Sequence, residues 1–468
     1  MNNTNRPAGG RNSSNDFTQG RILNRILGMA VPITLGQLIN ILYSVVDRIY
    51  VSRIPGAQAL ALTGLGLSVP VTVAVMAFAN LFGMGGGPLC SIRRGEGNDR
   101  EAQAIMCNSF VCLIFTGLIL TLLTAAFRKP LLYAIGASDQ TYPYANAYLS
   151  IYMFGIILVM VEYGMNYFIN AQGFGRISMI TVMSGAIANI ILDPIMIFGF
   201  HMGIQGAALA TVISQGISAI WVLRFLTGKK AIYRLELPAM KLKVSRILRI
   251  MELGFSGFIM AFTNSAVSVV CNSTLQAYGG DLYVGVMTVI STTREIIQLP
   301  VGGLTAGAQP VMGFNYGARA YSRVRESIRV TSVIGLIYTG GAWILISLLA
   351  GPIFRIFTTN PDLIRAGIPC LKIYYAAFIF MSLQFSGQST FQALGKARFS
   401  IFFSLLRKAI IVIPLTILLP RISFLGIYGV FAAEPISNIL GGTACYVTMF
   451  LTVYRGLPRQ DLQETTHS

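Results

Sequence analysis

Long apolar runs recur along the whole chain, and short polar or glycine-rich segments separate them. Each run is long enough to cross the roughly 30 Å hydrocarbon core of a bilayer as a helix. We therefore predict an all-α polytopic membrane protein with twelve transmembrane helices. The predicted spans cover residues 26–51, 60–85, 102–127, 144–169, 177–200, 203–226, 247–276, 282–312, 324–350, 367–391, 401–419 and 425–453.

The composition agrees with this pattern. Hydrophobic residues make up 54% of the 468 positions and charged residues only 11%, whereas a soluble protein carries about 25% charge. The six cysteines are scattered, so they predict neither a disulfide framework nor a metal site. The first twenty residues are polar and rich in Asn, Gly and Ser, which predicts a disordered cytoplasmic tail without a signal peptide.

The net charge of +18 suggests nucleic acid, but the basic residues lie in short segments between the spans. With the N-terminus inside, 26 of the 35 Lys and Arg residues fall on the cytoplasmic side and eight outside. Four of the 26 are assigned to the cytoplasmic segment 396–408, and Arg294 lies within a span. The positive-inside rule then predicts two cytoplasmic termini, with membrane lipids and no nucleic acid as partners.

The two halves of the chain repeat each other weakly. The segment "PLCSIRRG" from Pro88 aligns with "PVMGFNYG" from Pro310, a shift of 222 residues, and "GFGRIS" aligns with "GKARFS" at the same shift. Each half holds an even number of spans, which predicts two lobes related by a pseudo-two-fold axis along the membrane normal. The predicted divisions are a tail (1–20), an N-lobe (21–226), a cytoplasmic linker (227–246), a C-lobe (247–454) and a second tail (455–468).

This architecture is typical of a secondary transporter with a cavity between its lobes. The chain has no GxxxxGK[ST] phosphate-binding loop, so an ion gradient or the substrate's own gradient would drive transport. A membrane scaffold or channel is the alternative, but acidic residues inside the spans favour a carrier. An enzyme is disfavoured, because His201 and His467 are the only histidines and no metal-binding motif is present.

The stretch "ANIILDPI" places Asp193 inside an apolar run, with Asn189 one helical turn earlier on the same face. A carboxylate at membrane depth is costly unless it is paired, hydrated or protonated, and Pro194 predicts a departure from the regular helix. Hydroxyl groups of Thr211 and Tyr148, on neighbouring spans, could add ligands. Such oxygen atoms suit a hard cation, and a carboxylate alone suits a proton; the alternative is a helix-packing network.

Asp47 lies late in the first span, on the same face as Asn40, and its alternative role is an interfacial pair with Arg48 or Arg53. The repeat places Leu415 where the first half has Asp193. We therefore expect the ion-coupling site in the N-terminal half alone.

Three more acids fall within or near the ends of spans. Glu295, with Gln298 on its face, suits a counter-charge for a cationic substrate, and a salt bridge to an arginine on a neighbouring helix is the alternative. Glu162 and Glu434 are candidate cavity residues, with packing or interfacial roles as alternatives.

Four stretches together resemble the multidrug and toxic compound extrusion (MATE) family over nearly the whole chain. They are "LYSVVDRIYVSRIPGAQALALTGLG", "NIILDPIMIFGFHMGIQGAALATVISQ", "QPVMGFNYGARAYSRVRES" and "TFQALGKARFS". Glu295 and the "QPVMGFNYGA" segment resemble the DinF/MepA-like branch.

The resemblance implies twelve helices in two bundles and export of cationic or amphipathic compounds against inward H⁺ or Na⁺. It matches Asp47 and Asp193 to the ion-coupling acids of the family, and it matches Asn189 and Thr211 to the remaining side-chain ligands of a Na⁺ site. Asn40 and Tyr148 match neighbouring polar positions of that lobe. Acids that other branches carry on helices seven and ten are missing here.

We therefore predict a cation-coupled antiporter of the plasma (inner) membrane that acts as a monomer on small cationic or amphipathic drugs. The predicted cation-coupling residues are Asp47, Asn189, Asp193 and Thr211, and no cofactor beyond the coupling ion is expected. The predicted cavity residues are Asn40, Tyr148, Glu162, Glu295, Gln298 and Glu434. The alternative is a lipid-linked saccharide flippase, which would need a basic cavity, whereas the predicted spans are nearly free of Lys and Arg apart from Arg294 and residues at their ends.

Overall fold

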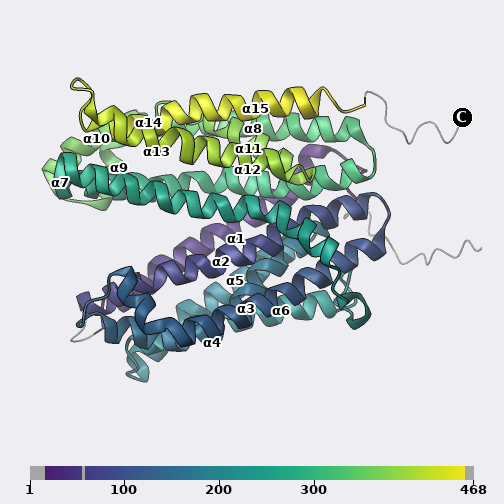
Figure 1. The fold of residues 1–468 in the computed structure, drawn as a ribbon, viewed down its shortest axis with the longest axis horizontal. Helices are drawn as coiled ribbons and strands as arrows, with labels where there is room; N and C mark the ends of the chain where they lie inside the picture. Colours follow the sequence, from purple (N-terminus) through teal and green to yellow (C-terminus); the bar gives the residue numbers. More distant parts are fainter. Residues whose placement is uncertain (1–15, 55–57, 459–468) are drawn as a thin grey trace, which may run out of the picture.

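The computed structural model describes residues 16–54 and 58–458, and this part of the chain is helical throughout, without strands (Figure 1). The first half holds six long helices. Their bounds are α1 (Ile22–Val51), α2 (Gln58–Gly95), α3 (Asp99–Ile135), α4 (Tyr142–Ala171), α5 (Gly175–Pro194), which continues into the π-helical turn η2 (Ile195–Gly199), and α6 (Ile204–Thr227).

The second half follows the short 3-10 helix η3 (Leu237–Met240). Its helices are α7 (Val244–Gly317), α8 (Tyr321–Leu348), α9 (Ala350–Phe357), α10 (Pro361–Tyr375), α11 (Phe378–Ala393), α12 (Ala397–Leu405), α13 (Ile413–Leu418), α14 (Tyr428–Ser437) and α15 (Thr443–Met449). Shorter turns join or extend these helices, namely η4 (Leu406–Val412), η5 (Leu419–Arg421), η6 (Asn438–Gly442) and η7 (Phe450–Tyr454).

Twelve spans are present in the described part of the chain. Ten helices are long and apolar enough to cross a membrane, and α10 with α11 forms one more span that is bent by 45°. The helix α7 is 74 residues long and breaks at Gly280, whose φ of 65° is accessible to glycine but strained for other residues. Because of this break, α7 contributes two spans. The predicted all-helical fold with twelve transmembrane helices is therefore confirmed.

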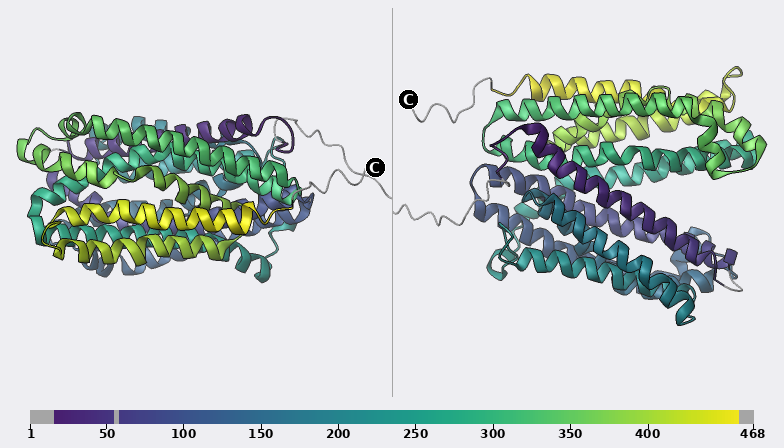
Figure 2. Two further views of the ribbon diagram at one scale, coloured as in Figure 1. Left: turned by 90° about the horizontal axis from the view of Figure 1, so that it is seen from above. Right: turned by 180° about the vertical axis from the view of Figure 1, so that it is seen from behind.

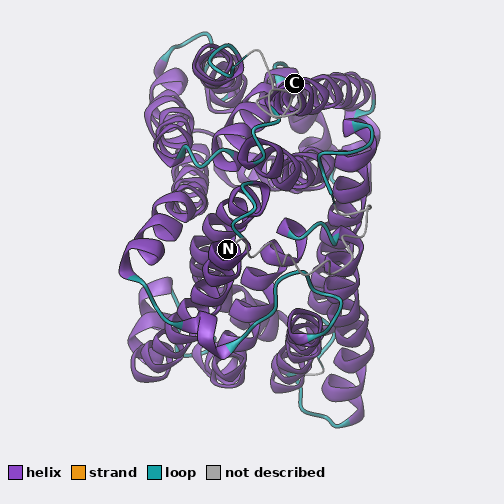
Figure 3. Ribbon diagram, turned by 90° about the vertical axis from the view of Figure 1, so that its right-hand side faces the viewer, coloured by secondary structure: helices purple, strands orange, loops and turns teal. Residues whose placement is uncertain are grey.

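The helices form two bundles that lie close together at one end of the molecule and diverge towards the other (Figures 1 and 2). The two ends of the described chain lie at the narrow end. Arg323 of α8 donates to the carbonyl oxygen of Phe17 at 3.0 Å, and Arg325 of the same helix donates to that of Leu457 at 3.1 Å. Both ends thus lie on one side of the membrane, as an even number of spans requires. Figure 3, seen from this end, shows the helices of both bundles nearly end-on.

The narrow end is held by close backbone contacts between α2 and α7, which come from different halves of the chain. A Cβ on Gly95 would overlap the carbonyl oxygen of Phe314, and a Cβ on Gly317 would overlap that of Ile92. Residues 92 and 95 map onto 314 and 317 by the shift of 222 found in the sequence. These contacts are therefore a symmetric pair about the pseudo-two-fold axis, which confirms the predicted relation between the lobes.

The outer surface carries large apolar side chains. Phe115 of α3, Ile337 of α8 and Leu348 at the end of α8 are 64%, 71% and 75% exposed. In water such a surface would drive aggregation, but the hydrocarbon core of a bilayer is an apolar solvent for it. This exposure is the physical counterpart of the apolar runs in the sequence.

Two connecting segments are tied to the helices. Residues 1–15 of the tail predicted to be disordered lie outside the described residues, but Phe17 is only 2% exposed and packs edge-on against Phe314, so the prediction is wrong for residues 16–20. In the linker, the hydroxyl of Tyr233 donates to Asp99 at 2.6 Å. Burial, with this hydrogen bond, raises the pKa of Tyr233 well above its usual range, so it remains a donor.

Candidate cation site and substrate cavities

Two helices of the N-lobe bring the predicted acids together. Asp193 lies at the end of α5, directly before the π-helical turn η2, where Pro194 ends the α-helix as predicted. Its side chain is fully buried, and Asn189, one turn earlier, donates from Nδ2 to Asp193 Oδ1 at 3.3 Å. The carboxyl group of Asp47, on α1, faces that of Asp193. The i, i+4 spacing read from the sequence thus places both side chains on the face that meets α1.

Several oxygen atoms at this meeting point are buried without a hydrogen-bond partner in the described part of the chain. They are Asp47 Oδ1, Asp193 Oδ2 and Asn189 Oδ1. A buried acceptor left unsatisfied is costly, and two facing carboxylates add mutual repulsion. A proton shared by the carboxyl groups or a hard cation bound by the oxygen atoms would remove both penalties, because carboxylate and amide oxygens are the ligands such cations prefer. The residues present therefore fit a Na⁺ ion or a proton.

The hydroxyl of Tyr148, on α4, lies next to the hydroxyl of Thr211, on α6. Tyr148 is buried and stacks on Tyr152, with ring centroids 5.9 Å apart. It does not line the cavity described next, whereas Thr211 does. Of the two hydroxyl groups, only that of Thr211 thus lines this cavity.

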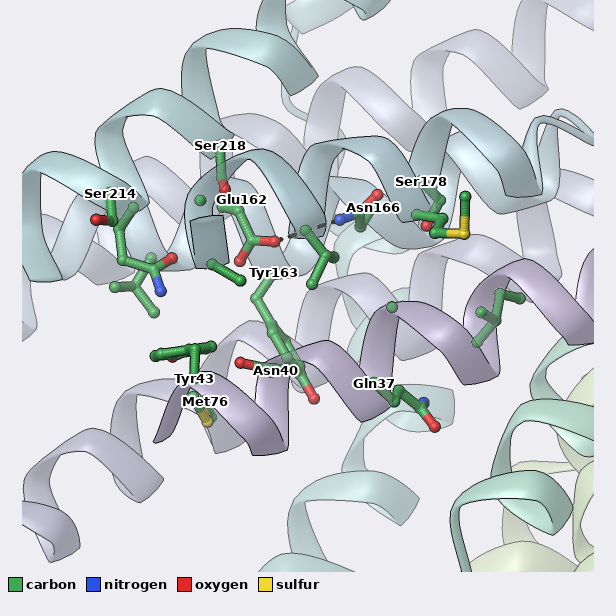
Figure 4. Close-up of a pocket in the computed structure, with 18 of the residues that line it drawn as sticks. Gln37, Asn40, Tyr43, Met76, Glu162, Tyr163, Asn166, Ser178, Ser214 and Ser218 are labelled. Atoms are coloured by element: carbon green, nitrogen blue, oxygen red, sulfur yellow. Dashed lines mark hydrogen bonds between the residues drawn. The ribbon is translucent and has the colours of Figure 1, made fainter. Parts of the chain in front are cut away.

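A cavity of about 150 Å³ opens beside the acids within the N-lobe. Figure 4 shows Tyr43, Asn40 and Gln37 of α1 on one side and Glu162 of α4 on the other. Glu162 is 7% exposed and accepts a hydrogen bond from Asn166 Nδ2 at 3.3 Å. The cavity wall is thus both polar and aromatic, which suits an amphipathic ligand.

The N-lobe acids are not neutralised by bases. Among residues 16–54 and 58–458, no Lys, Arg or His lies within 4.0 Å of the carboxylate oxygens of Asp47, Glu162 or Asp193. Within a low-dielectric bundle this leaves a region of negative potential. Such a region attracts cations, whether they are coupling ions or substrates.

Sequence reasoning missed some of the cavity residues. Gln215 lines the cavity, and its Oε1 is buried without a hydrogen-bond partner in the described chain. The signal was available, because Gln215 follows Thr211 by one helical turn on the same face of α6. Gln37 and Tyr43 could likewise have been found from Asn40, since all three lie on one face of α1.

Glu434 is held very differently from the N-lobe acids. It is 5% exposed, and its carboxylate accepts from Arg407 at 3.1 Å and from Lys408 at 3.1 Å, with Arg294 at 3.8 Å. Arg407 and Lys408 lie on the π-helical turn η4, in the interior of the eleventh span. A π-helical turn inside a helix often marks a functional position. Glu434 therefore belongs to a buried ion network in the C-lobe.

This network corrects two steps of the sequence analysis. Lys408 is only 4% exposed and lies within the bundle, so Arg407 and Lys408 were wrongly assigned to a cytoplasmic segment. The cytoplasmic count falls from 26 to 24 against eight, which still favours the predicted orientation. The expectation that the spans are nearly free of Lys and Arg apart from Arg294 and residues at their ends is also wrong, because Arg407 and Lys408 meet Arg294 around Glu434 inside the C-lobe.

A second cavity of about 280 Å³ lies beside this network. Glu295 lines it, is exposed, and makes no ion pair within 4.0 Å in the part of the chain that the structure describes. Gln298, one turn later, is half-buried and donates from Nε2 to Met381 Sδ at 3.1 Å. Glu295 and Glu434 therefore border this cavity, whereas Gln298 does not.

We expect Glu434→Gln to destabilise the protein strongly. The change leaves the buried Lys408 and the partly buried Arg407 and Arg294 without their anion. Breaking a buried pair in this way costs about 3–5 kcal/mol. A fall in the melting temperature of purified protein in detergent measures the effect. Glu252→Gln is the matched control, because Glu252 meets Arg398 at 3.8 Å with both side chains largely exposed and such pairs contribute little. Equal melting temperatures for the two variants would contradict the expectation.

Comparison with known proteins agrees with this fold. The MatE family model matches residues 32–195 and 256–418, one segment in each half. Multidrug export protein MepA of Staphylococcus haemolyticus (strain JCSC1435) is 25% identical over 440 residues, 93% of this chain and 94% of the relative. MepA of Staphylococcus aureus (strain MSSA476) is 24% identical over 442 residues, 94% and 95% of the two chains. A solved outward-facing structure of a multidrug resistance MATE family transporter superposes with a TM-score of 0.89 at 20% identity, covering 95% and 99%.

Proposed function

The chain belongs to the MatE family, and from this premise we propose that it is a cation-coupled multidrug efflux antiporter. It exports cationic or amphipathic compounds by alternating access, and an inward flow of H⁺ or Na⁺ drives the export. The relatives named multidrug export protein support the drug-export part, since they match over nearly the full length of both chains.

One observation carries the coupling part of the proposal. Asp47, Asn189 and Asp193 each keep a buried oxygen atom without a hydrogen-bond partner among the described residues. Two of these residues are carboxylates that face each other inside a span, which is costly for a protein that only needs to pack these helices. A cation or proton bound there and released in another conformation would make them useful, because a ligand shifts a conformational equilibrium only through its different affinity for the two states.

The proposed cycle uses the two lobes as follows. With the lobes apart at the wide end, Asp47 and Asp193 bind the coupling ion, and their negative charge is reduced. Lower charge lessens the repulsion between α1 and α5 and changes their packing around the N-lobe cavity. A substrate held by Asn40, Glu162 and the aromatic wall, or by Glu295 between the lobes, is then released. Closure at the wide end carries the ion to the opposite side.

Reconstituted liposomes test the proposal. Either a pH gradient or a Na⁺ gradient is imposed alone, and the movement of a fluorescent lipophilic cation is measured. We expect uphill movement of the dye with at least one gradient and none when both are collapsed. A parallel set of liposomes with a labelled lipid tests the flippase alternative, which the basic network in the C-lobe keeps open. Lipid translocation without gradient-driven dye movement would contradict the antiporter.

The distribution of charges supports a proposed orientation. Both ends of the described chain lie at the narrow end, next to the basic start of α8. We place this end at the cytoplasmic face of the plasma membrane, where anionic lipids favour basic residues. We also propose that the protein works as a monomer.

A further inference from the structure

The C-lobe cavity has a charge balance opposite to that of the N-lobe. Arg294 and Lys408 of the C-lobe and Arg48 of α1 line it, and Arg407 pairs with Glu434, which also lines it. Three cations meet one anion, so the cluster carries a net charge of +2 when every group is ionised. An excess of charge inside a bundle is costly unless a partner compensates it.

The three cations differ in how closely they contact the carboxylate of Glu434. Lys408 Nζ reaches both carboxylate oxygens, at 3.1 and 3.3 Å. Arg407 is held by Glu434 and by Asn438 Oδ1, at 3.1 and 2.8 Å. Arg294 is the exception, because it lies 3.8 Å from Glu434.

Arg294 has donors to spare. A guanidinium carries five N–H donors, yet Nη1 of Arg294 donates to the hydroxyl of Tyr374 at 2.8 Å, and its buried Nε has no hydrogen-bond partner among the described residues. Its side chain is 25% exposed and borders the cavity. Arg294 is thus fixed in position by Tyr374 while part of its planar fork remains available.

We propose that this cavity binds the carboxylate of a small amphipathic acid or zwitterion, with Arg294 as the main donor and Lys408 behind it. This inference rests on the proposed export function and extends its substrate range beyond cations. An arginine fork accepts a carboxylate through two parallel hydrogen bonds. The bound carboxylate also offsets part of the excess charge of the cluster.

Glu295 gives the cavity an anion that can bind an amine on the ligand. It follows Arg294 in the chain, borders the same cavity and has no ion pair within 4.0 Å in the described ranges. Asn264, Asn272 and Thr292 add uncharged donors and acceptors to the polar wall, and Arg48 of α1 adds a further cation. A ligand that carries a carboxylate and an amine can therefore meet both charges, whereas a simple cation meets Glu295 alone.

A matched pair of rhodamine dyes tests the inference, one with a free carboxyl group and the other its methyl ester. Gradient-driven transport and binding to purified protein, followed by fluorescence anisotropy, are measured for both. We expect Arg294→Gln to lower the ratio of acid to ester binding at least five-fold. Arg294→Lys should restore part of the ratio, because it keeps the charge. Arg398→Gln, which removes an arginine with 93% side-chain exposure, is the control and should leave the ratio unchanged.

The outcomes are separate from those of the general proposal. An acid-to-ester ratio that Arg294→Gln leaves unchanged would overturn the inference, even if ester transport is normal. Failure of gradient-driven ester transport would contradict the antiporter, while the binding ratio would still decide the role of Arg294. The measurements are repeated with phosphatidylglycerol in the vesicles. If this anionic lipid abolishes the preference for the acid, the site takes a lipid headgroup and the small-molecule assignment is wrong.

Discussion

Replacement of Asp193 by asparagine is expected to lower the rate of ion-driven export about 10- to 150-fold. The side chain is fully buried, and its Oδ2 has no hydrogen-bond partner among the described residues. A coupling ion or proton would supply the partner that this oxygen lacks. An interaction with a charged group contributes about 1.5–3 kcal/mol, which corresponds to a loss of about 10- to 150-fold. The measurement is the initial rate of dye export into liposomes under the gradient that drives the wild type.

The size and fold of the variant should be close to those of the wild type, because asparagine has the shape of aspartate and can still bond with Asn189. Asp47→Asn should lose export to a similar extent, and the double variant should lose little more, since residues that act as a unit are not additive. Asp139→Asn is the matched control, because Asp139 lies on the exposed loop between α3 and α4. Full gradient-driven export by the Asp193→Asn protein would show that the coupling site lies elsewhere.

The sequence predicts the N-lobe features well because they depend on local spacing. Asp193 and Asn189 are one helical turn apart, and the structure joins them by a hydrogen bond. The long apolar runs similarly predict the spans, since a helix that satisfies its own backbone is the simplest solution in lipid. The facing of Asp47 and Asp193 came from the family resemblance, because no local pattern relates α1 to α5.

The C-lobe shows what a local pattern cannot predict. Arg407 and Lys408 look like residues at a cytoplasmic end, because the anion that compensates them is Glu434, which lies on another helix. Their burial becomes plausible only when the packing of α14 against the turn η4 is known. Phe17 is a similar case, since a single aromatic residue in a polar tail does not indicate the partner, Phe314, that buries it.

Substitution of the paired glycines at the narrow end should stop transport by a different route. Alanine at Gly95 and Gly317 would place each new Cβ on a carbonyl oxygen of the opposite lobe, at Phe314 and Ile92. Overpacking of this kind costs about 1–3 kcal/mol per site, and only the conformation closed at this end carries the cost. The equilibrium should therefore shift about five- to more than a hundred-fold per site towards the conformation open to the side of the termini.

A cysteine at Ser91 reports this shift directly. Ser91 is 1% exposed and packs on Gly313 of α7, so a membrane-impermeant maleimide should label it slowly in an otherwise cysteine-free background and much faster when Gly95 and Gly317 are alanine. Gly66→Ala is the control on the same helix, since its new Cβ meets no atom within 4 Å. Slow labelling together with normal export in the double variant would contradict the prediction that these glycine contacts close the narrow end. Fast labelling with lost export would show that alternating access depends on two backbones meeting where only glycine fits.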